Sequence, residues 1–336
     1  MLELGYKAAT EQIQPRDLLE YAVQAEAAGF DSVWASDHFH PWMDRGASTF
    51  VWTWLGALGE RTERLRLGTE VTCPTLRYHP ALVAQAAATL GAMYPGRAFL
   101  SVGSGESLNE TPLTGLWPAY AERRDRLAEA VDLIRRLWTG RSVTFHGEFY
   151  DTYSAKLYTV PETPPPIYLA ADGPRSARLA GRAADGLITT STTPQQYEPV
   201  LGAFREAAQA AGRDPEALPR CVEIKVMLGT PEEAVPVVRQ WWGSSLFPIM
   251  FNREIYDPTE AETLGQMVGV EAVARKVFIS PDPDAHVAYL EPFLQAGFTT
   301  LILFCPDPDQ RPFLEAYGRH VLPRLREAAQ RAGARP

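Results

Sequence analysis

Short apolar segments alternate with longer amphipathic ones along almost the whole chain of 336 residues. This alternation is typical of repeated βα units, which build a parallel sheet. Eight of the short segments have the character of buried strands: residues 2–7, 32–36, 65–72, 98–103, 167–171, 187–190, 221–228 and 299–305. Because eight such units in series close more naturally than they stay open, we predict an α/β fold of the (β/α)8 TIM-barrel type. A doubly wound open sheet is the weaker alternative.

The segments between these strands predict the helices of the barrel: residues 15–29, 50–60, 80–94, 121–138, 176–184, 199–211, 232–242 and 284–295. Two stretches depart from this alternation of strands and helices. The first is an excursion near residues 141–165, with a strand-like run at 142–149, and the second is an insertion near residues 243–282, with a short helix at 270–277. No linker divides the chain, so we expect a single barrel domain over residues 1–336.

The charge and the cysteine content exclude several classes of function. A net charge of −9 argues against a nucleic-acid or polyanion surface as the main role. Cys73, Cys221 and Cys305 are odd in number and far apart, so we expect neither a disulfide framework nor a zinc site. The sequence shows no signal-peptide pattern and no apolar run of membrane-spanning length. We therefore expect a cytoplasmic protein without a membrane or nucleic-acid partner.

Residues 36–42, at the end of the second strand, read Ser-Asp-His-Phe-His-Pro-Trp. The carboxyl ends of barrel strands are where such folds carry out chemistry. An acid, two imidazoles and an indole at this point can handle protons beside a flat ring. Asp-His pairs also close turns, and a Trp after a Pro can simply pack, so these seven residues alone leave both interpretations open.

The fourth strand ends in Gly103-Ser104-Gly105-Glu106. Glycines there let a ligand approach the backbone closely, and the peptide N–H groups can face an anionic edge. Glu106 is placed at the mouth of the barrel, where partial burial would raise its pKa enough for proton transfer. For this motif taken alone, a solvated turn carboxylate is the simpler interpretation.

Three further strand ends are polar. Residues 170–176 run into a helix N-terminus that can cradle a phosphate, although Ser176 can equally act as a cap and Asp172 is a discordant charge. Residues 189–193 are rich in hydroxyls, which suit a turn or a polyol ligand. Residues 70–74 form a tight turn of the kind that can hold a cis peptide. Since no Rossmann, Walker or metal-ligand pattern is present, we expect no metal and no Rossmann-bound nicotinamide.

Taken together, the motifs make the chain similar to a known family. Asp37-His38 with Pro41-Trp42, combined with Gly105-Glu106 and Leu108-Asn109-Glu110, resembles the coenzyme F420-dependent branch of the luciferase-like barrel superfamily. Within it the chain looks most like the F420-dependent glucose-6-phosphate dehydrogenase group. The similarity covers nearly the whole chain and includes Gly5-Tyr6-Lys7 and Glu223-Ile224-Lys225.

The resemblance implies a role for particular residues. His38 matches the base that takes a proton from the substrate hydroxyl, Trp42 the indole that steadies the developing charge, and Glu106 the carboxyl that manages the proton at the deazaflavin. The implied contacts to the cofactor, coenzyme F420, come from Asp37, Glu70, Val71, Cys73, Ser104, Gly105, Asn109, Asp172, Gly173, Arg175 and Ser176. The Glu70–Val71 peptide is expected to be cis.

The substrate side departs from the family pattern. The sugar-phosphate enzymes hold the phosphate with two lysines and an arginine, whereas this chain aligns Thr193, Asn252 and Lys276 there and keeps Thr190 as a hydroxyl contact. Two of three cations are thus lost, although Arg253 and Arg275, next to the aligned positions in the sequence, are candidate substitutes. Asp172 replaces a glycine of the cofactor site. We therefore expect that glucose 6-phosphate is not the best substrate.

The leading hypothesis is an F420-dependent dehydrogenase that oxidises a hydroxyl or hemiacetal carbon of a sugar phosphate, a sugar or a secondary alcohol. The alternatives are an FMN-dependent luciferase-like monooxygenase and a barrel that binds a flavin-like ligand without turnover. The resemblance also implies a homodimer, for which the Trp-rich residues 51–54 offer apolar surface, although helix packing explains them equally well.

Overall fold

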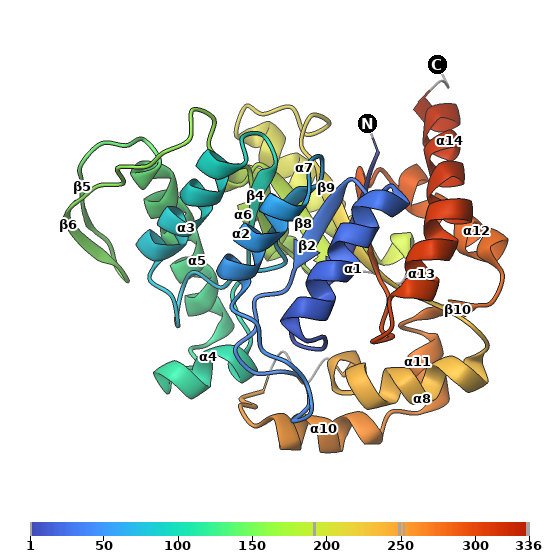
Figure 1. Cartoon of the computed structure of the whole chain (residues 1–336). Coiled ribbons are helices and arrows are strands. Elements are labelled where there is room, and N and C mark those ends of the chain that lie inside the picture. The colour runs from blue at the N-terminus through green and yellow to red at the C-terminus, as the bar shows by residue number, and fades with distance from the viewer. Residues whose placement is uncertain (1, 191–192, 248–249, 251–252, 334–336) are drawn as a thin grey trace.

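The computed structural model describes residues 2–190, 193–247, 250 and 253–333 (Figure 1). Eight parallel strands form the central sheet: β1 (Glu3–Ala8), β2 (Ser32–Ala35), β3 (Arg66–Thr69), β4 (Ala98–Val102), β7 (Ile167–Ala170), β8 (Gly186–Thr190), β9 (Arg220–Leu228) and β11 (Thr300–Phe304). They pair in this order, and β11 pairs with β1, so the sheet closes on itself. The predicted (β/α)8 barrel is confirmed, and the open-sheet alternative is wrong. That residues 1–336 form one domain stays a prediction.

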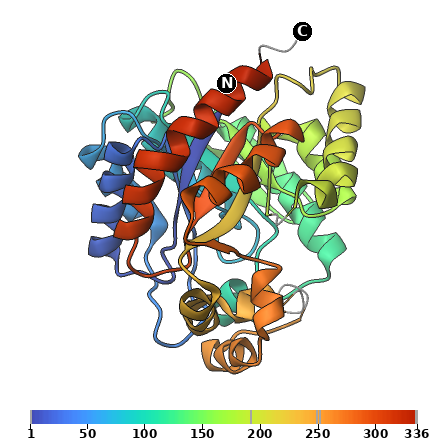
Figure 2. The same ribbon diagram turned by 90° about the vertical axis from the view of Figure 1, so that its right-hand side faces the viewer.

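Helices surround the strands on the outside, as Figures 1 and 2 show. They are α1 (Pro15–Ala28), α2 (Val51–Arg61), α3 (Pro80–Met93), α5 (Tyr120–Leu137), α6 (Pro174–Ala183), α7 (Glu198–Ala210), α8 (Pro231–Trp242), α12 (Pro283–Gln295), α13 (Arg311–Ala316) and α14 (Leu322–Gly333). Except for α8, whose buried residues belong to a separate cluster, their apolar faces pack against the outer faces of the strands and form the main core. Burial of this apolar surface is the main force that stabilises the closed barrel.

Alternate strand residues fill the inside of the barrel, because successive side chains of a strand point to opposite faces. The inward cluster consists of Trp34, Phe99, Tyr168, Ile188, Cys221 and Ile302. Gly68 makes room for this packing, since a Cβ there would lie 2.3 Å from the carbonyl oxygen of Phe99. The barrel is therefore solid at this level, and its open end lies at the carboxyl ends of the strands.

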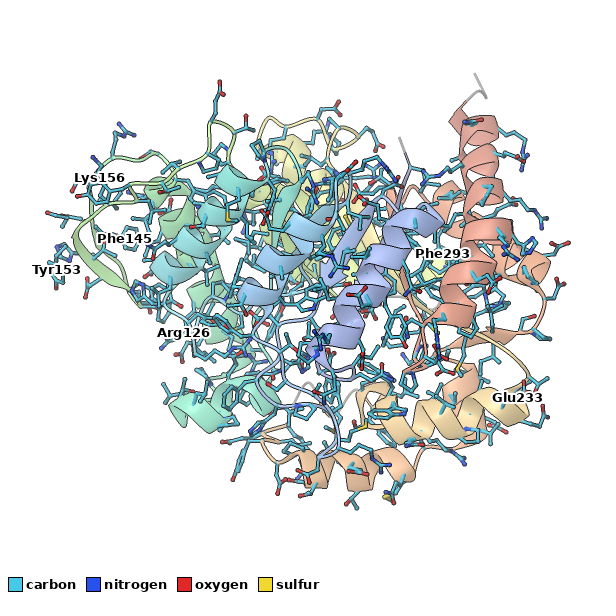
Figure 3. The ribbon with its side chains drawn as sticks, viewed as in Figure 1. Arg126, Phe145, Tyr153, Lys156, Glu233 and Phe293 are labelled. Carbon is cyan, nitrogen blue, oxygen red and sulfur yellow. The ribbon has the colours of Figure 1, made fainter. Side chains whose placement is uncertain are left out.

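Three segments differ from the prediction. The run at 142–149 is one half of an antiparallel hairpin, β5 (Val143–His146) and β6 (Asp151–Ala155), which stands away from the barrel with Tyr153 at its outer edge (Figure 3). The predicted helix at 270–277 ends at Ala274 as α11 (Val270–Ala274), because the chain then adds β10 (Phe278–Ser280) to the end of β9. Strand three stops at Thr69, and the next peptide, Glu70–Val71, is cis as expected.

The insertion and a helix between β4 and α5 lie at the open end of the barrel. The insertion contains a 3-10 turn, η2 (Ser244–Leu246), followed by α10 (Pro258–Gln266) and α11, and it builds a separate apolar cluster with α8. The helix between β4 and α5 is α4 (Ser107–Thr114), which begins directly after Glu106. Neither α4 nor α10 was predicted. None of the helices in the described ranges is long and apolar enough to cross a membrane.

Candidate active site

A cavity of about 850 Å³ opens at the carboxyl ends of the barrel strands. This volume lies in the range of small-molecule and cofactor sites. It brings together all the predicted site residues except two: Asp37, His38, Trp42, Glu70, Val71, Cys73, Ser104, Gly105, Glu106, Asn109, Asp172, Gly173, Arg175, Ser176, Thr190 and Lys276 line it. Thr193 is not among the lining residues, and Asn252 lies outside the described residues.

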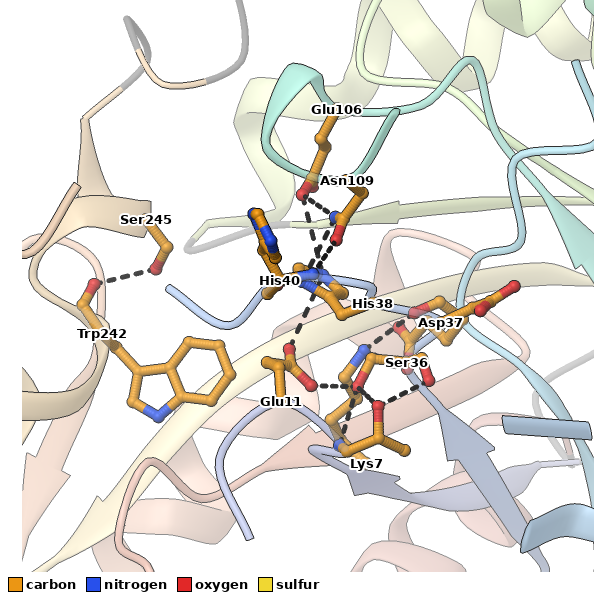
Figure 4. Close-up of polar contacts among 12 residues, drawn as sticks. Lys7, Glu11, Ser36, Asp37, His38, His40, Glu106, Asn109, Trp242 and Ser245 are labelled. Carbon is orange, nitrogen blue, oxygen red and sulfur yellow. Dashed lines mark hydrogen bonds and ion pairs between the residues drawn. The ribbon is translucent and has the colours of Figure 1, made fainter. Parts of the chain in front are cut away.

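His38 lies between two carboxylates at the wall of this cavity (Figure 4). Its Nε2 is 3.8 Å from Oε1 of Glu11 and 3.7 Å from Oε2 of Glu106. Its Nδ1 is 3.1 Å from the backbone carbonyl oxygen of His40, an acceptor that favours the tautomer with the proton on Nδ1. That tautomer leaves Nε2, the nitrogen between the two carboxylates, free to accept a proton.

Asn109, in the first turn of α4, fixes the position of these groups. Its Oδ1 accepts hydrogen bonds from the backbone N–H groups of Phe39, at 2.8 Å, and His40, at 3.1 Å. Its amide nitrogen is therefore turned the other way and donates to Oε2 of Glu106 at 3.2 Å. It also lies 3.2 Å from Nδ1 of His38, which carries a proton in the tautomer above and accepts no hydrogen bond from it. One side chain thus connects the loop after β2 to the loop after β4.

Glu106 is the residue immediately before α4 and is partly buried in the cavity wall. Burial raises the pKa of Glu106 above its ordinary value, although the neighbouring imidazole of His38 works against the shift. A carboxyl with a raised pKa can hold a proton near neutral pH and release it again. The solvated-turn interpretation of Glu106 is therefore the weaker one.

Asp37 lies behind His38 and has its carboxylate fully engaged. It accepts hydrogen bonds from Thr72 at 2.7 Å and Tyr78 at 3.2 Å, and Arg77 lies 3.0 Å from Oδ1. Arg77 also pairs with Glu110 at 3.4 Å, and burial raises the pKa of Glu110 to about 7. This buried network holds the loops after β2, β3 and β4 together.

A second buried network forms the floor of the cavity, one layer above the aromatic cluster. Nζ of Lys7 donates to the carbonyl oxygen of Glu70 at 3.0 Å and lies 3.3 Å from its carboxylate and 3.6 Å from that of Glu223. Glu223 pairs in turn with Lys225 at 2.6 Å. Burial opposes the charge of Lys7, but the two carboxylates outweigh it and raise its pKa. Burial raises the pKa of Glu70 to about 8.

One wall of the cavity is suited to a flat ring and to an anionic group. Gly105 has a positive φ of 84°, and a Cβ there would lie 2.7 Å from Sγ of Cys73, so only glycine keeps the backbone open at this point. Further along, Gly173 precedes α6, and the first turn of that helix presents free N–H groups. Asp172 accepts a hydrogen bond from Thr189 at 3.0 Å, which ties it to the end of β8.

The opposite wall is largely apolar and comes from the end of α8 and from the insertion. Trp242 and Leu246 are buried there, and Phe304 closes the space towards the strands. Nε1 of Trp242 is a buried donor with no hydrogen-bond partner among the described residues. Lys276 reaches the same wall, and no carboxylate of the described chain lies within ion-pair distance of it.

Several lining residues were not predicted from the sequence, in particular Lys7, Glu11, Glu223, Lys225 and Trp242. A signal existed for the lysines, because the chain has only four and two of them fall inside predicted strands. Metal-binding geometry is not seen: no group of three or more His, Cys, Asp or Glu side chains in the described ranges could hold a metal ion.

Comparison with known proteins identifies the family of the chain. A family model described as luciferase-like monooxygenase matches residues 2–300. The F420-dependent glucose-6-phosphate dehydrogenase of Nakamurella multipartita is 46% identical over 328 residues, which cover 97% of each chain. The enzyme of the same name from Mycolicibacterium smegmatis is 46% identical over 334 residues, 98% of this chain and 99% of the relative.

The same relationship is seen among solved structures. An F420-dependent secondary alcohol dehydrogenase in complex with an F420-acetone adduct superposes with a TM-score of 0.92 at 37% identity, covering 96% of this chain and 99% of that one. The F420-dependent tetrahydromethanopterin reductase of Methanopyrus kandleri, at 21% identity and a TM-score of 0.79, shares the fold. The chain therefore belongs to the luciferase-like monooxygenase family and, within it, to the group of the F420-dependent glucose-6-phosphate dehydrogenases.

Proposed function

We propose that the chain is an F420-dependent dehydrogenase that takes a hydride from a hydroxyl- or hemiacetal-bearing carbon. The observation that carries the proposal is the position of His38, whose Nε2 lies between Glu11 and Glu106 at the cavity wall and whose ring centroid is 5.7 Å from that of Trp42. An alcohol must lose a proton as its hydride leaves, so such a site needs a base on the substrate side and a second proton-handling group near the hydride acceptor.

The cavity fits the cofactor on the evidence of its own residues. The open backbone at Gly105, with Val71 and Cys73 beside it, leaves space for a flat ring, and the start of α6 at Gly173 and Ser176 offers N–H groups to a phosphate. We propose that these residues hold coenzyme F420, with further contacts from the other predicted cofactor residues. When bound, the deazaflavin of this coenzyme supplies the hydride acceptor.

Different side chains then handle the proton of the substrate and the proton on the cofactor side. His38 accepts the hydroxyl proton of the substrate at Nε2, and Glu11 and Glu106 stabilise the imidazolium that forms. Trp42 packs against the imidazole and limits access of water to it. Glu106, whose pKa is raised by burial, holds or releases the proton on the cofactor side. Asn109 positions Glu106 through its amide nitrogen and the loop of His38 through the backbone N–H groups of Phe39 and His40.

The substrate belongs to the class of sugar phosphates, sugars and secondary alcohols. The relatives named above act on glucose 6-phosphate or on a secondary alcohol by their names. In this chain Lys276 can attract an anionic substrate, and Thr190 and Nε1 of Trp242 can bind hydroxyl groups. Lys225 beside Phe304 is paired with Glu223, and Thr193 is not among the lining residues, so within the described ranges Lys276 is the cation at this wall without a paired carboxylate. We therefore expect glucose 6-phosphate to be outperformed by another member of the class.

Steady-state assays test this function. Purified protein is mixed with coenzyme F420 and with glucose 6-phosphate, other sugar phosphates, free sugars or secondary alcohols, and the loss of the oxidised deazaflavin spectrum is followed. Reduction by at least one of these alcohols is expected. Failure with all of them, together with retained FMN and consumption of oxygen, would instead identify a monooxygenase.

We also propose that the protein works as a cytoplasmic homodimer. Phe50, Leu82 and Met93, on or next to α2 and α3, are more than half exposed, and pairing of two copies through this face would bury them. The three described cysteines are buried free thiols, which suits a reducing compartment. Light scattering of the wild type and of Leu82→Lys tests the dimer: the wild type should have twice the mass of the chain, and the variant should shift towards the monomer.

A further inference from the structure

A second, smaller cavity of about 320 Å³ adjoins the active site between α5 and α6. Its lining consists of Arg124, Asp125, Ala128, Arg175, Arg178, Leu179 and Arg182. Arg175, Arg178 and Arg182 are spaced three and four residues apart, so they form one stripe along α6 that faces this groove. Arg124, Arg175 and Leu179 also line the main cavity, so the arginine groove continues directly from the active site.

The charge of this groove is opposite to that of the protein. The whole chain carries −9, yet four arginines and a single carboxylate line the groove. The carboxylate, Asp125, is paired with Arg124 at 2.8 Å. For Arg175, Arg178 and Arg182, no carboxylate of the described residues lies within 4.0 Å. Like charges gathered without counter-charges repel one another, which makes the groove a favourable place for an anion.

Arg123, which precedes Arg124 in α5, lines the main cavity but not the groove. Its side chain is buried, its guanidinium lies 3.7 Å from the ring centroid of Trp117, and it donates a hydrogen bond to the carbonyl oxygen of Pro118. Its Nε is buried and has no hydrogen-bond partner within the described part of the chain. A buried N–H group without an acceptor is unfavourable, so an acceptor supplied by a ligand would stabilise this arrangement.

We propose that the arginine groove binds the anionic side chain of the cofactor, while the cofactor ring occupies the main cavity. The inference rests on the proposed function and extends it to the part of coenzyme F420 that carries a phosphodiester and glutamate carboxylates. A guanidinium forms two parallel hydrogen bonds with a carboxylate or phosphate, which suits it to such a flexible acidic chain. The competing interpretation is a solvated helix face, with Arg182 merely stabilising the C-terminal end of α6.

Binding titrations decide between these interpretations. The double variant Arg178→Ala/Arg182→Ala is compared with the wild type, with the deazaflavin fluorescence as the readout, at low and at high salt. Each protein is titrated with intact coenzyme F420 and with its deazariboflavin fragment, which lacks the phosphate and the carboxylates. A matched control, Arg16→Ala/Arg319→Ala, removes the same charge from α1 and from the segment after α13.

For the groove variant we expect the Kd of intact F420 to rise about 3- to 30-fold at low salt, which corresponds to about 0.3–1 kcal/mol for each exposed pair. The Kd of the fragment and both Kd values of the control should stay at the wild-type level, and high salt should shrink the difference. An unchanged Kd for intact F420, or an equal rise for the fragment, overturns the inference and leaves the proposed function standing. If the wild type binds neither molecule, the proposed function itself fails and the groove assignment falls with it.

Discussion

Replacement of Lys7 by methionine tests the charged floor of the active site. Nζ of Lys7 lies 3.3 Å from Oε2 of Glu70 and 3.6 Å from Oε2 of Glu223, and all three residues are buried. Burial raises the pKa of Glu70 to about 8, so near neutral pH Glu70 is protonated and Lys7 is paired mainly with Glu223. Without Lys7, Glu223 keeps Lys225 at 2.6 Å as its partner. The variant therefore loses one charged contact, which contributes about 1.5–3 kcal/mol to the free energy of unfolding.

The pH dependence makes this expectation specific. A glutamate in the unfolded chain has a pKa of about 4.3, so the folded protein retains a proton at Glu70 that the unfolded chain releases. In both proteins, the contribution of Glu70 to the free energy of unfolding therefore falls as the pH rises from about 4.3 towards 8. Above pH 8 the wild-type Glu70 ionises, so the free energy of unfolding of the wild type stops falling. Without Lys7 the pKa of Glu70 is higher, so the free energy of unfolding of the variant continues to fall above pH 8.

Urea unfolding followed by tryptophan fluorescence measures this difference. Below pH 8 the two free energies of unfolding should differ by a constant amount of about 2 kcal/mol, equivalent to about 3 °C in Tm for a chain of this length. Above pH 8 the gap should widen by about 1.4 kcal/mol per pH unit. The double variant Lys7→Met/Glu70→Gln should show no widening. If the free energies of unfolding of the wild type and of Lys7→Met differ by the same amount above pH 8 as below it, the reasoning is refuted.

Further expectations concern the catalytic side chains. His38→Ala should lower kcat about 10²- to 10⁴-fold while the Kd of F420 changes little in a fluorescence titration, and wild-type turnover would contradict its role as the base. Glu106→Gln should remove the limb of the pH–rate profile that reflects its raised pKa and leave Tm unchanged; a sharp drop in Tm with an unchanged rate per folded molecule would indicate a structural role. Asn109→Ala should lower kcat about 10- to 100-fold, because Glu106 and the loop that carries His38 lose their common support, and an unchanged kcat would refute this. Lys276→Met should raise KM about 10-fold for sugar phosphates but not for neutral alcohols, and equal effects on both would contradict an anion contact.

The strongly periodic elements could be predicted from the sequence, and the elements made by tertiary contacts could not. All eight barrel strands were predicted within a few residues, because each is an apolar run between turn residues. Helix α4 was missed, since Pro112 lies inside it and its eight residues show little apolar periodicity. Strand β10 has only three residues and exists because it pairs with the end of β9. Strand β6 likewise depends on its partner β5.

The polar side chains after strands could be predicted, and those inside strands could not. His38 and Glu106 follow apolar runs, so their place at the barrel mouth follows from the fold class. Lys7 and Glu223 lie within strands, where a charged residue is usually predicted to face solvent. Their place inside the barrel depends on register: Glu223 lies two residues after the inward Cys221 and therefore points to the same face one layer higher. The arginine groove depends on the packing of α5 against α6, which no local pattern reports.

The proton-handling side of the cavity and the substrate side come from different parts of the chain. Glu11, His38 and Glu106 lie on loops after barrel strands, and the partly buried Phe39–Asn109 hydrogen bond and the His38–Glu11 contact tie these loops together. Trp242, Leu246 and Lys276 belong to α8 and the insertion, which pack as a separate apolar cluster that meets the first group through Trp42. Because the two packing units are distinct, changes in the insertion can alter the substrate wall without moving the base. Relatives with this fold carry names that specify a sugar phosphate in one case and a secondary alcohol in the other, as such a division allows. Substrate choice should therefore follow residues 243–282 more closely than the strand ends.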